Sequence, residues 1–133
     1  MLSLDSKPAD MIAFVAQWFG LMAEGRVEAA LSQLDEPNSY GISWTRDVIE
    51  RLLADTFCHS RYLDRHPEGP RFTTPDTATG KPRADVLALD DGSGYSLGHD
   101  VPLNGEWSDL TAQFEFLRRD AGYAVVLDDL HVL

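Results

Sequence analysis

His99 and Asp100 are adjacent in the chain, and a histidine beside a carboxylate can work as a general acid–base pair. Both belong to the segment GYSLGHDVPL, in which apolar and polar residues alternate as they do in a β-strand. Neighbouring residues of a strand point to opposite faces of its sheet. We therefore expect His99 to face the core and Asp100 to face solvent, which excludes a catalytic dyad unless a bulge intervenes.

A hairpin with Asn104-Gly105 at its tip is predicted from the chemistry of this dipeptide, which favours a two-residue turn. The turn sets the register, so that Leu103 lies opposite Glu106 and, counting outward, His99 lies opposite Leu110. In this register one face of the hairpin collects nearly all the apolar side chains. The match between turn and alternation places His99 on that apolar face.

The last hairpin decides which polar side chains join His99. A four-residue loop, RDAG, would bring Asp129 and His131 to the same inner face as His99. A three-residue loop, DAG, would instead turn Asp128 inward and Asp129 and His131 outward. Either register puts one carboxylate on an apolar face, where it needs a hydrogen-bonding partner or a raised pKa. Both registers stay open, and both predict a mostly apolar pocket with a polar end.

Aromatic side chains could form the walls of this pocket. Tyr95 lies on the apolar face of the hairpin, Trp18 lies in the first predicted helix, and Tyr40 follows the second. Aromatic residues at helical spacing are usually part of a core, which is the alternative for Trp18. The candidate ligand-binding residues are therefore His99, Asp129, His131, Tyr95, Trp18 and Tyr40, and no catalytic residue is assigned.

Three helices are predicted to precede the sheet. Pro8 suits the first turn of a helix, and apolar residues then recur at helical spacing until Gly25. The segment RVEAALSQLDEPN predicts a second, shorter helix, and Thr45 can cap a third helix that runs through Phe57. The short segment YGISW between them is expected to be extended. Cys58, near the end of the third helix, is expected to be a buried and inert thiol.

Residues 59–82 contain four prolines and two glycines and predict a long loop, in which residues 71–74 could form a short strand. Loops of this length are often functional or mobile. Four strand-like runs follow, and their short, glycine-containing connections predict an antiparallel meander over residues 83–132. Helices followed by a meander predict the α+β class, with residues 1–133 as a single domain.

Composition narrows the range of partners. The chain has 22 acidic and 11 basic residues and a formal net charge of −11, which disfavours binding to nucleic acid or to an anionic membrane. An acidic surface of this kind is usually just solvated, but it could also dock a basic protein partner. The segment MLSLDSKPAD lacks the features of a signal peptide, so a cytoplasmic protein is expected. No motif for a metal or a cofactor is present, and none is expected.

The order of elements resembles that of the NTF2-like (SnoaL-like) cone fold: three helices, the short segment YGISW, and a long curved meander. The chain's last 30 residues are also similar to the C-terminal part of small uncharacterised bacterial proteins. The resemblance implies a pocket between the helices and a concave sheet, and a homodimer formed through sheet faces. We place that dimer on the outer face, where Trp107 stands among polar residues.

The resemblance does not extend to the catalytic pattern of the ketosteroid-isomerase branch. That branch has a tyrosine on the first helix, where this chain offers Phe14, Gln17 and Trp18. The favoured hypothesis is a non-catalytic bacterial domain that binds a small ligand or a protein. The alternative is a small acid–base enzyme, of isomerase or hydrolase type, acting on an apolar substrate in the cone. Titratable groups that converge in an open cavity would favour the enzyme, whereas a filled core would favour binding elsewhere.

Overall fold

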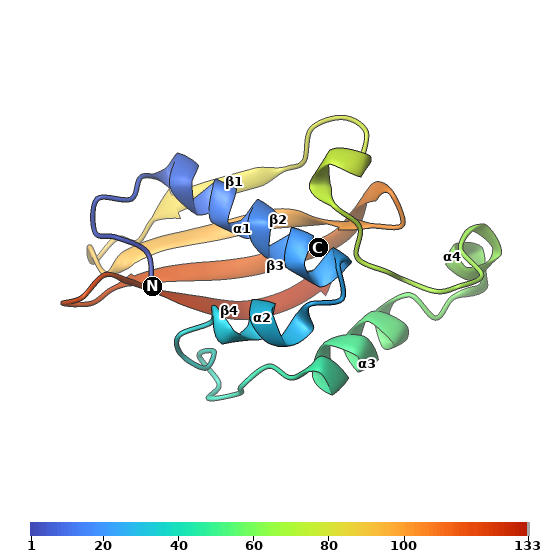
Figure 1. Ribbon diagram of the computed structural model, residues 1–133, viewed down its shortest axis with the longest axis horizontal. Coiled ribbons are helices and arrows are strands. Elements are labelled where there is room, and N and C mark those ends of the chain that lie inside the picture. The colour runs from blue at the N-terminus through green and yellow to red at the C-terminus, as the bar shows by residue number, and fades with distance from the viewer. Residues whose placement is uncertain (133) are drawn as a thin grey trace.

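The computed structural model describes residues 1–132, and within them it contains four α-helices, one short 3-10 helix and one four-stranded sheet (Figure 1). The helices come first in the chain and the strands last. The elements are α1 (Pro8–Ala23), α2 (Val27–Ser32), α3 (Arg46–Thr56), α4 (Ser60–Arg65), the 3-10 helix η1 (Pro75–Thr77), β1 (Ala84–Ala88), β2 (Gly94–Leu103), β3 (Glu106–Arg118) and β4 (Tyr123–Val132). All neighbouring strands are antiparallel, in the order β1-β2-β3-β4. The predicted α+β class and the meander are confirmed.

The first helix forms as its sequence predicts. Pro8 occupies the first turn, and the Asp10 carboxylate accepts a hydrogen bond from the Lys7 backbone N–H at 2.8 Å. Gly25 follows the helix with φ +77°, a left-handed conformation that glycine adopts without a steric cost. α1 lies across one face of the sheet, which we call the inner face (Figure 1). No helix within residues 1–132 is both long and apolar enough to cross a membrane.

Two further helices form where the sequence predicts them. α2 ends at Ser32, earlier than the segment RVEAALSQLDEPN suggests, and the Thr45 hydroxyl caps α3 by accepting from the Val48 N–H at 3.2 Å. The extended segment predicted for YGISW is not a strand. The side chain of Asn38 instead accepts hydrogen bonds from the backbone N–H groups of Tyr40 and Ile42, which folds the segment into a local turn.

The region predicted as a long loop contains two short helices, α4 and η1. At six and three residues, they are too short to show a helical period in the sequence. The proposed strand at residues 71–74 is reduced to one bridge between Phe72 and Leu103. Cys58 was expected to be buried but is exposed, because the preceding Phe57 takes the core position at the end of α3.

The β2–β3 hairpin keeps the predicted register only near its tip. Leu103 pairs with Glu106 as expected, but the register then shifts by two residues between Asp100 and Pro102, so that His99 lies opposite Ala112 and not Leu110. Pro102 has no N–H to donate to the ladder, which explains the interruption at this point. Because the shift is an even number of residues, His99 and Leu110 stay on the inner face and Asp100 stays on the outer face.

The β3–β4 hairpin combines features of both predicted registers. Next to its loop the four-residue register holds, with Phe114 opposite Leu127. A bulge then adds one residue to β4 at Asp128, so that Ala112 pairs with Leu130 where Asp129 was expected. Either regular register would bury a carboxylate on the inner face. The bulge avoids that cost and places the apolar Leu130 in the core.

Candidate functional site

His99 faces the helices as predicted, but it is packed into a filled core. Only 2% of its surface is exposed, and its ring centroid lies 5.2 Å from that of Phe19 and 5.8 Å from that of Trp107. Its Nδ1 donates a hydrogen bond to the Asp100 carbonyl oxygen at 2.7 Å. Burial lowers the pKa of His99, so the ring is neutral near pH 7. The geometry is that of a satisfied core histidine.

The acidic residues and histidine of β4 do not join His99. Asp129 pairs with Gln113 and His131 with Thr111, so both point to the outer face, where the Asp129 carboxylate lies 3.3 Å from His131 Nδ1. Asp128, at the bulge, accepts hydrogen bonds from the backbone and the hydroxyl of Ser39. The expectation that one of these carboxylates faces the helices beside His99 is therefore wrong.

The three aromatic candidates, Trp18, Tyr95 and Tyr40, also do not line a common pocket. Trp18 is completely buried, and its indole N–H donates to the Ala30 carbonyl oxygen at 3.0 Å. Tyr95 packs against Tyr123, with 6.0 Å between the ring centroids. Tyr40 is 82% exposed in the segment before α3. The predicted pocket between α1 and the sheet is thus occupied by side chains of the core.

His99 should make stability depend on pH. Its pKa is lowered by burial in the folded state and is about 6.5 in the unfolded state, so protonation favours unfolding. Its stabilising contribution is fully present above that unfolded-state pKa and is lost as the pH falls through the folded-state pKa. We expect the free energy of unfolding, measured by urea denaturation from pH 8 to pH 5, to fall more steeply for the wild type than for His99→Gln. Parallel curves would show that His99 does not titrate in this way.

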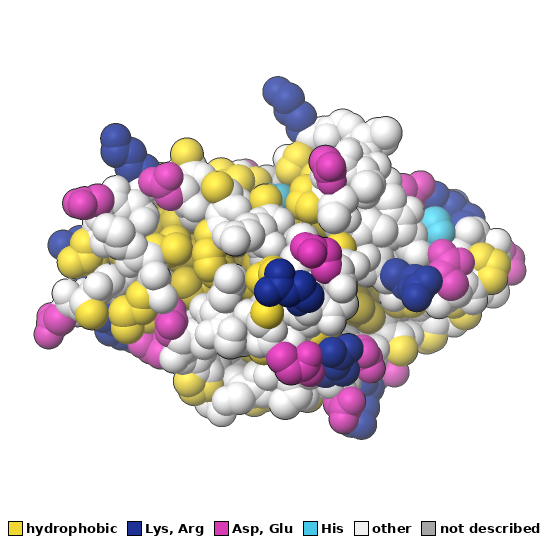
Figure 2. Space-filling model, in the orientation of Figure 1, with side chains coloured by type: hydrophobic (Ala, Val, Ile, Leu, Met, Phe, Trp, Pro, Cys, Tyr) yellow, Lys and Arg dark blue, Asp and Glu magenta, His cyan; other side chains and the backbone are white. Residues whose placement is uncertain are grey.

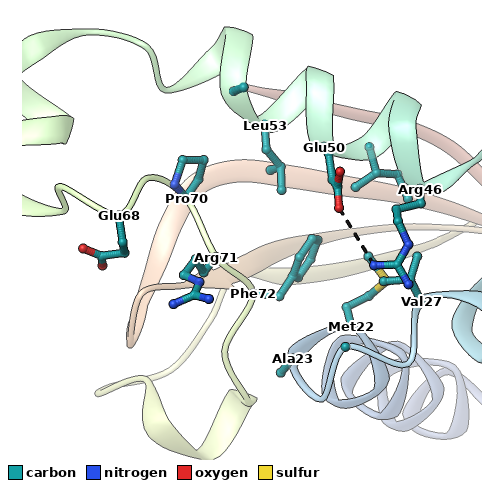
Figure 3. A pocket seen from close by; sticks show the side chains of 13 residues that line it. Met22, Ala23, Val27, Arg46, Glu50, Leu53, Glu68, Pro70, Arg71 and Phe72 are labelled. Atoms are coloured by element: carbon teal, nitrogen blue, oxygen red, sulfur yellow. Dashed lines mark ion pairs between the residues drawn. The ribbon is translucent and has the colours of Figure 1, made fainter.

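A cleft on the helical side of the molecule is a stronger candidate for a binding site (Figure 3). It has a volume of about 430 Å³, within the usual range for small-molecule sites. The end of α1, the start of α2, one side of α3 and residues 68–72 surround it. We call it the α1–α3 cleft; its lining includes the apolar side chains of Met22, Val27, Ile49, Leu53 and Phe72. In Figure 3 Leu53 and Phe72 point into it.

Charged side chains surround this apolar floor. Arg46 lies at one side of the cleft, where its guanidinium is 2.8 Å from Glu28 and 3.9 Å from Glu50. The Glu28 carboxylate raises the pKa of Arg46, which therefore stays charged. Arg71 lies at the other side, and within residues 1–132 its guanidinium makes no ion pair or hydrogen bond. Arg71 is thus a positive charge available to an incoming group. Figure 2 shows that acidic and basic side chains are otherwise interspersed over this face of the molecule.

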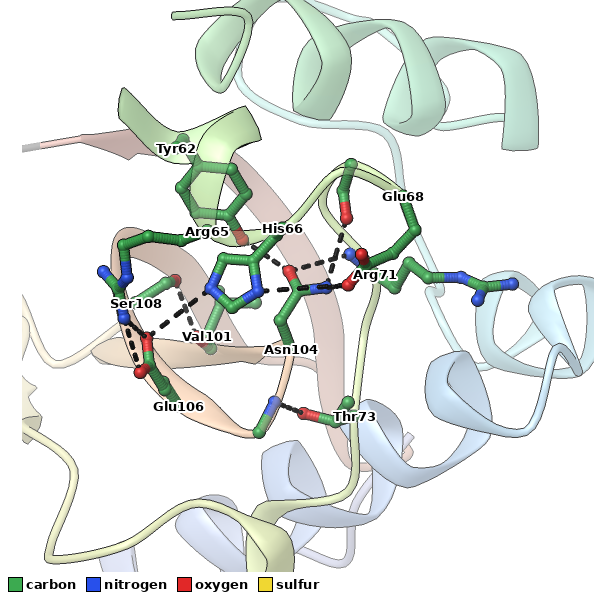
Figure 4. A network of polar contacts seen from close by, with 12 residues as sticks. Tyr62, Arg65, His66, Glu68, Arg71, Thr73, Val101, Asn104, Glu106 and Ser108 are labelled. Carbon is green, nitrogen blue, oxygen red and sulfur yellow. Dashed lines mark hydrogen bonds and ion pairs between the residues drawn. The ribbon is translucent and has the colours of Figure 1, made fainter. Parts of the chain in front are cut away.

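The wall that carries Arg71 is held in place by the side chain of Asn104 at the hairpin tip (Figure 4). Its Oδ1 accepts from the Tyr62 hydroxyl and, at 3.3 Å, from the Arg71 N–H. Its Nδ2 donates to the Glu68 carboxylate at 2.9 Å and to the Gly69 carbonyl oxygen at 3.1 Å. The residue predicted only as half of a turn therefore also joins the hairpin to residues 62–71.

His66 lies between two carboxylates in the same network. Its Nδ1 is 3.9 Å from Glu68 and its Nε2 is 3.9 Å from Glu106, which also accepts hydrogen bonds from the Arg65 guanidinium at 2.7 and 2.9 Å. The two 3.9 Å distances are too long for direct hydrogen bonds between His66 and these carboxylates. Within residues 1–132 no group of three His, Cys, Asp or Glu side chains is arranged to hold a metal ion. The hydrogen bonds between Arg65 and Glu106 hold the end of α4 and the segment after it against the hairpin.

Sequence reasoning missed the α1–α3 cleft because its walls come from four separate segments. One signal was present: Arg71 belongs to the basic segment between Arg61 and Arg83. Comparisons of this chain with protein-family models, with curated proteins and with solved structures found no match. What the site can do is therefore argued from its own geometry.

Proposed function

We propose that this chain is a non-catalytic NTF2-like domain that binds a small amphipathic anion in the α1–α3 cleft. The observation that carries the proposal is the unpaired Arg71 guanidinium beside an apolar cleft of about 430 Å³. An apolar group on the floor would displace water, and an acidic group at the mouth would form a charge-assisted hydrogen bond with Arg71. Ligand sites commonly combine apolar walls with a few polar groups in this way.

Several observations support a binding domain over an acid–base enzyme. An acid–base catalyst must reach the substrate in order to exchange a proton with it. The ring of His99 instead contacts the aromatic rings of Phe19 and Trp107. With 2% of its surface exposed, His99 is also not open to a substrate. In the cone hypothesis the ligand would lie between α1 and the sheet. We instead place the ligand in the α1–α3 cleft. The order of helices and strands still supports the NTF2-like assignment.

The proposal can be tested with 8-anilinonaphthalene-1-sulfonate, a fluorescent probe that has an apolar body and one sulfonate. We expect saturable binding at one site, competition by decanoate, and little competition by decanol, which lacks the charge. Removing the cation with Arg71→Gln should weaken binding about fivefold to thirtyfold, as expected for a charge-assisted hydrogen bond worth about 1–2 kcal/mol.

Two further variants make the test specific to the cleft. Ala54→Trp places a large side chain at an exposed position of the lining and should abolish binding without disturbing the core. Arg51→Gln removes the same charge as Arg71→Gln from an exposed position of α3 outside the lining, so it should bind like the wild type. Equal affinity in the wild type, Arg71→Gln and Ala54→Trp would refute the proposal.

A further inference from the structure

The two edges of the sheet differ in how far other segments of the chain cover them. The β4 edge is covered from Tyr123 to Leu127. Leu2 forms a bridge with Tyr123, Asp35 exchanges two hydrogen bonds of 2.8 Å with Val125, and the Trp44 indole N–H donates to the Leu127 carbonyl oxygen. These contacts satisfy main-chain groups that an edge strand would otherwise expose.

The β1 edge has no such cover within residues 1–132. The Arg83 carbonyl oxygen accepts from Asp100 N–H and the Leu89 N–H donates to Gly94, each at 2.9 Å, so the odd-numbered residues face β2. In an antiparallel strand the main-chain groups alternate in direction. The N–H and C=O groups of Ala84, Val86 and Ala88 therefore point away from the sheet, and no described group bonds them. Beside them the side chain of Leu87 is 67% exposed.

The charges that flank β1 have opposite signs at its two ends. Lys81 and Arg83 precede the strand, and Asp90 and Asp91 follow it; all four residues are exposed. When two copies of such a strand pair antiparallel, each basic end lies beside the acidic end of the other copy. A parallel partner strand of the same sequence would instead bring like charges together, which is destabilising.

We propose that β1 pairs antiparallel with β1 of a second copy of this chain, joining two sheets into one across a two-fold axis. The register that uses every free group places Val86 opposite the partner's Val86 and Ala84 opposite the partner's Ala88. Lys81 and Arg83 then lie within reach of the partner's Asp91. A surface patch that pairs with itself in this way is what two-fold dimers require. The inference does not depend on a ligand in the α1–α3 cleft.

Charge variants can test the proposal through complementation. Lys81→Glu with Arg83→Glu makes both ends of the strand acidic, whereas Asp90→Lys with Asp91→Asn removes the acidic end. The Asp91→Asn change keeps a side-chain oxygen that can accept from the Ser93 N–H, as the carboxylate does. By sedimentation equilibrium we expect the wild type to dimerise and each double variant to dimerise at least about tenfold more weakly. An equimolar mixture of the two double variants should recover dimers.

Val86→Pro provides an independent variant, because it removes an N–H that points away from β2 and leaves the β1–β2 ladder intact. It should be folded, by circular dichroism, and monomeric. A wild type that is monomeric at 200 µM would overturn the proposal. So would a wild-type dimer that all three variants retain, since that result would place the interface elsewhere, for example on the outer face.

Discussion

Trp18→Ala is expected to lower the free energy of unfolding by about 3–5 kcal/mol, the range for removing a large aromatic side chain from a core. Trp18 is fully buried, and its ring centroid lies 5.4 Å from that of Phe114 and 6.3 Å from that of Phe72. It therefore connects α1, the sheet and the segment after α4. The cavity left by alanine would remove packing contacts from all three at once.

A milder variant separates packing from hydrogen bonding. Trp18→Phe keeps much of the apolar contact but leaves the Ala30 carbonyl oxygen without the indole N–H that it accepts at 3.0 Å. We expect a loss of about 1–3 kcal/mol, the cost of an unsatisfied buried group. Urea denaturation followed by circular dichroism measures both variants. If Trp18 were instead the wall of an open ligand pocket, Trp18→Ala would leave stability nearly unchanged and would affect binding alone.

Asn104→Gly is expected to release the wall of the α1–α3 cleft. The change removes the side chain that bonds Tyr62, Glu68, Gly69 and Arg71, while glycine accepts the positive φ of 52° at this position. We expect a loss of about 1–3 kcal/mol in the free energy of unfolding. Because Arg71 would no longer be held at the cleft, affinity for the sulfonate probe should also fall.

Hydrogen exchange locates this effect. Backbone amides of residues 66–72 should exchange faster in Asn104→Gly than in the wild type, whereas amides of α1 should change only as far as global stability does. Asn104→Asp is the matched control: it can still accept from Tyr62 and Arg71, but it replaces the amide that donates to Glu68 with a second carboxylate. It should lose the contacts to Glu68 and Gly69, both of which accept from the amide, and keep those to Tyr62 and Arg71. Unchanged exchange at residues 66–72 would show that Asn104 acts only as a turn residue.

The elements that the sequence determined by itself are those specified by local chemistry. Apolar spacing after Pro8 and the stop at Gly25 predict α1, because helix periodicity and capping depend on neighbouring residues only. Alternation and Asn104-Gly105 predict the β2–β3 hairpin and the inward direction of His99 in the same way. Helix α4 was not predicted because its six residues are too few to show a helical period in the sequence.

Tertiary structure decided every feature that depends on competition between distant segments. The local sequence could not decide whether Asp128 or Asp129 would be buried. The bulge in β4 avoids burying either carboxylate and places the apolar Leu130 in the core, which is lower in free energy. The second role of Asn104 depends on a segment more than 30 residues away in the chain. The α1–α3 cleft and the bare edge of β1 likewise exist only once helices and strands are placed, since both are defined by what the rest of the chain leaves uncovered.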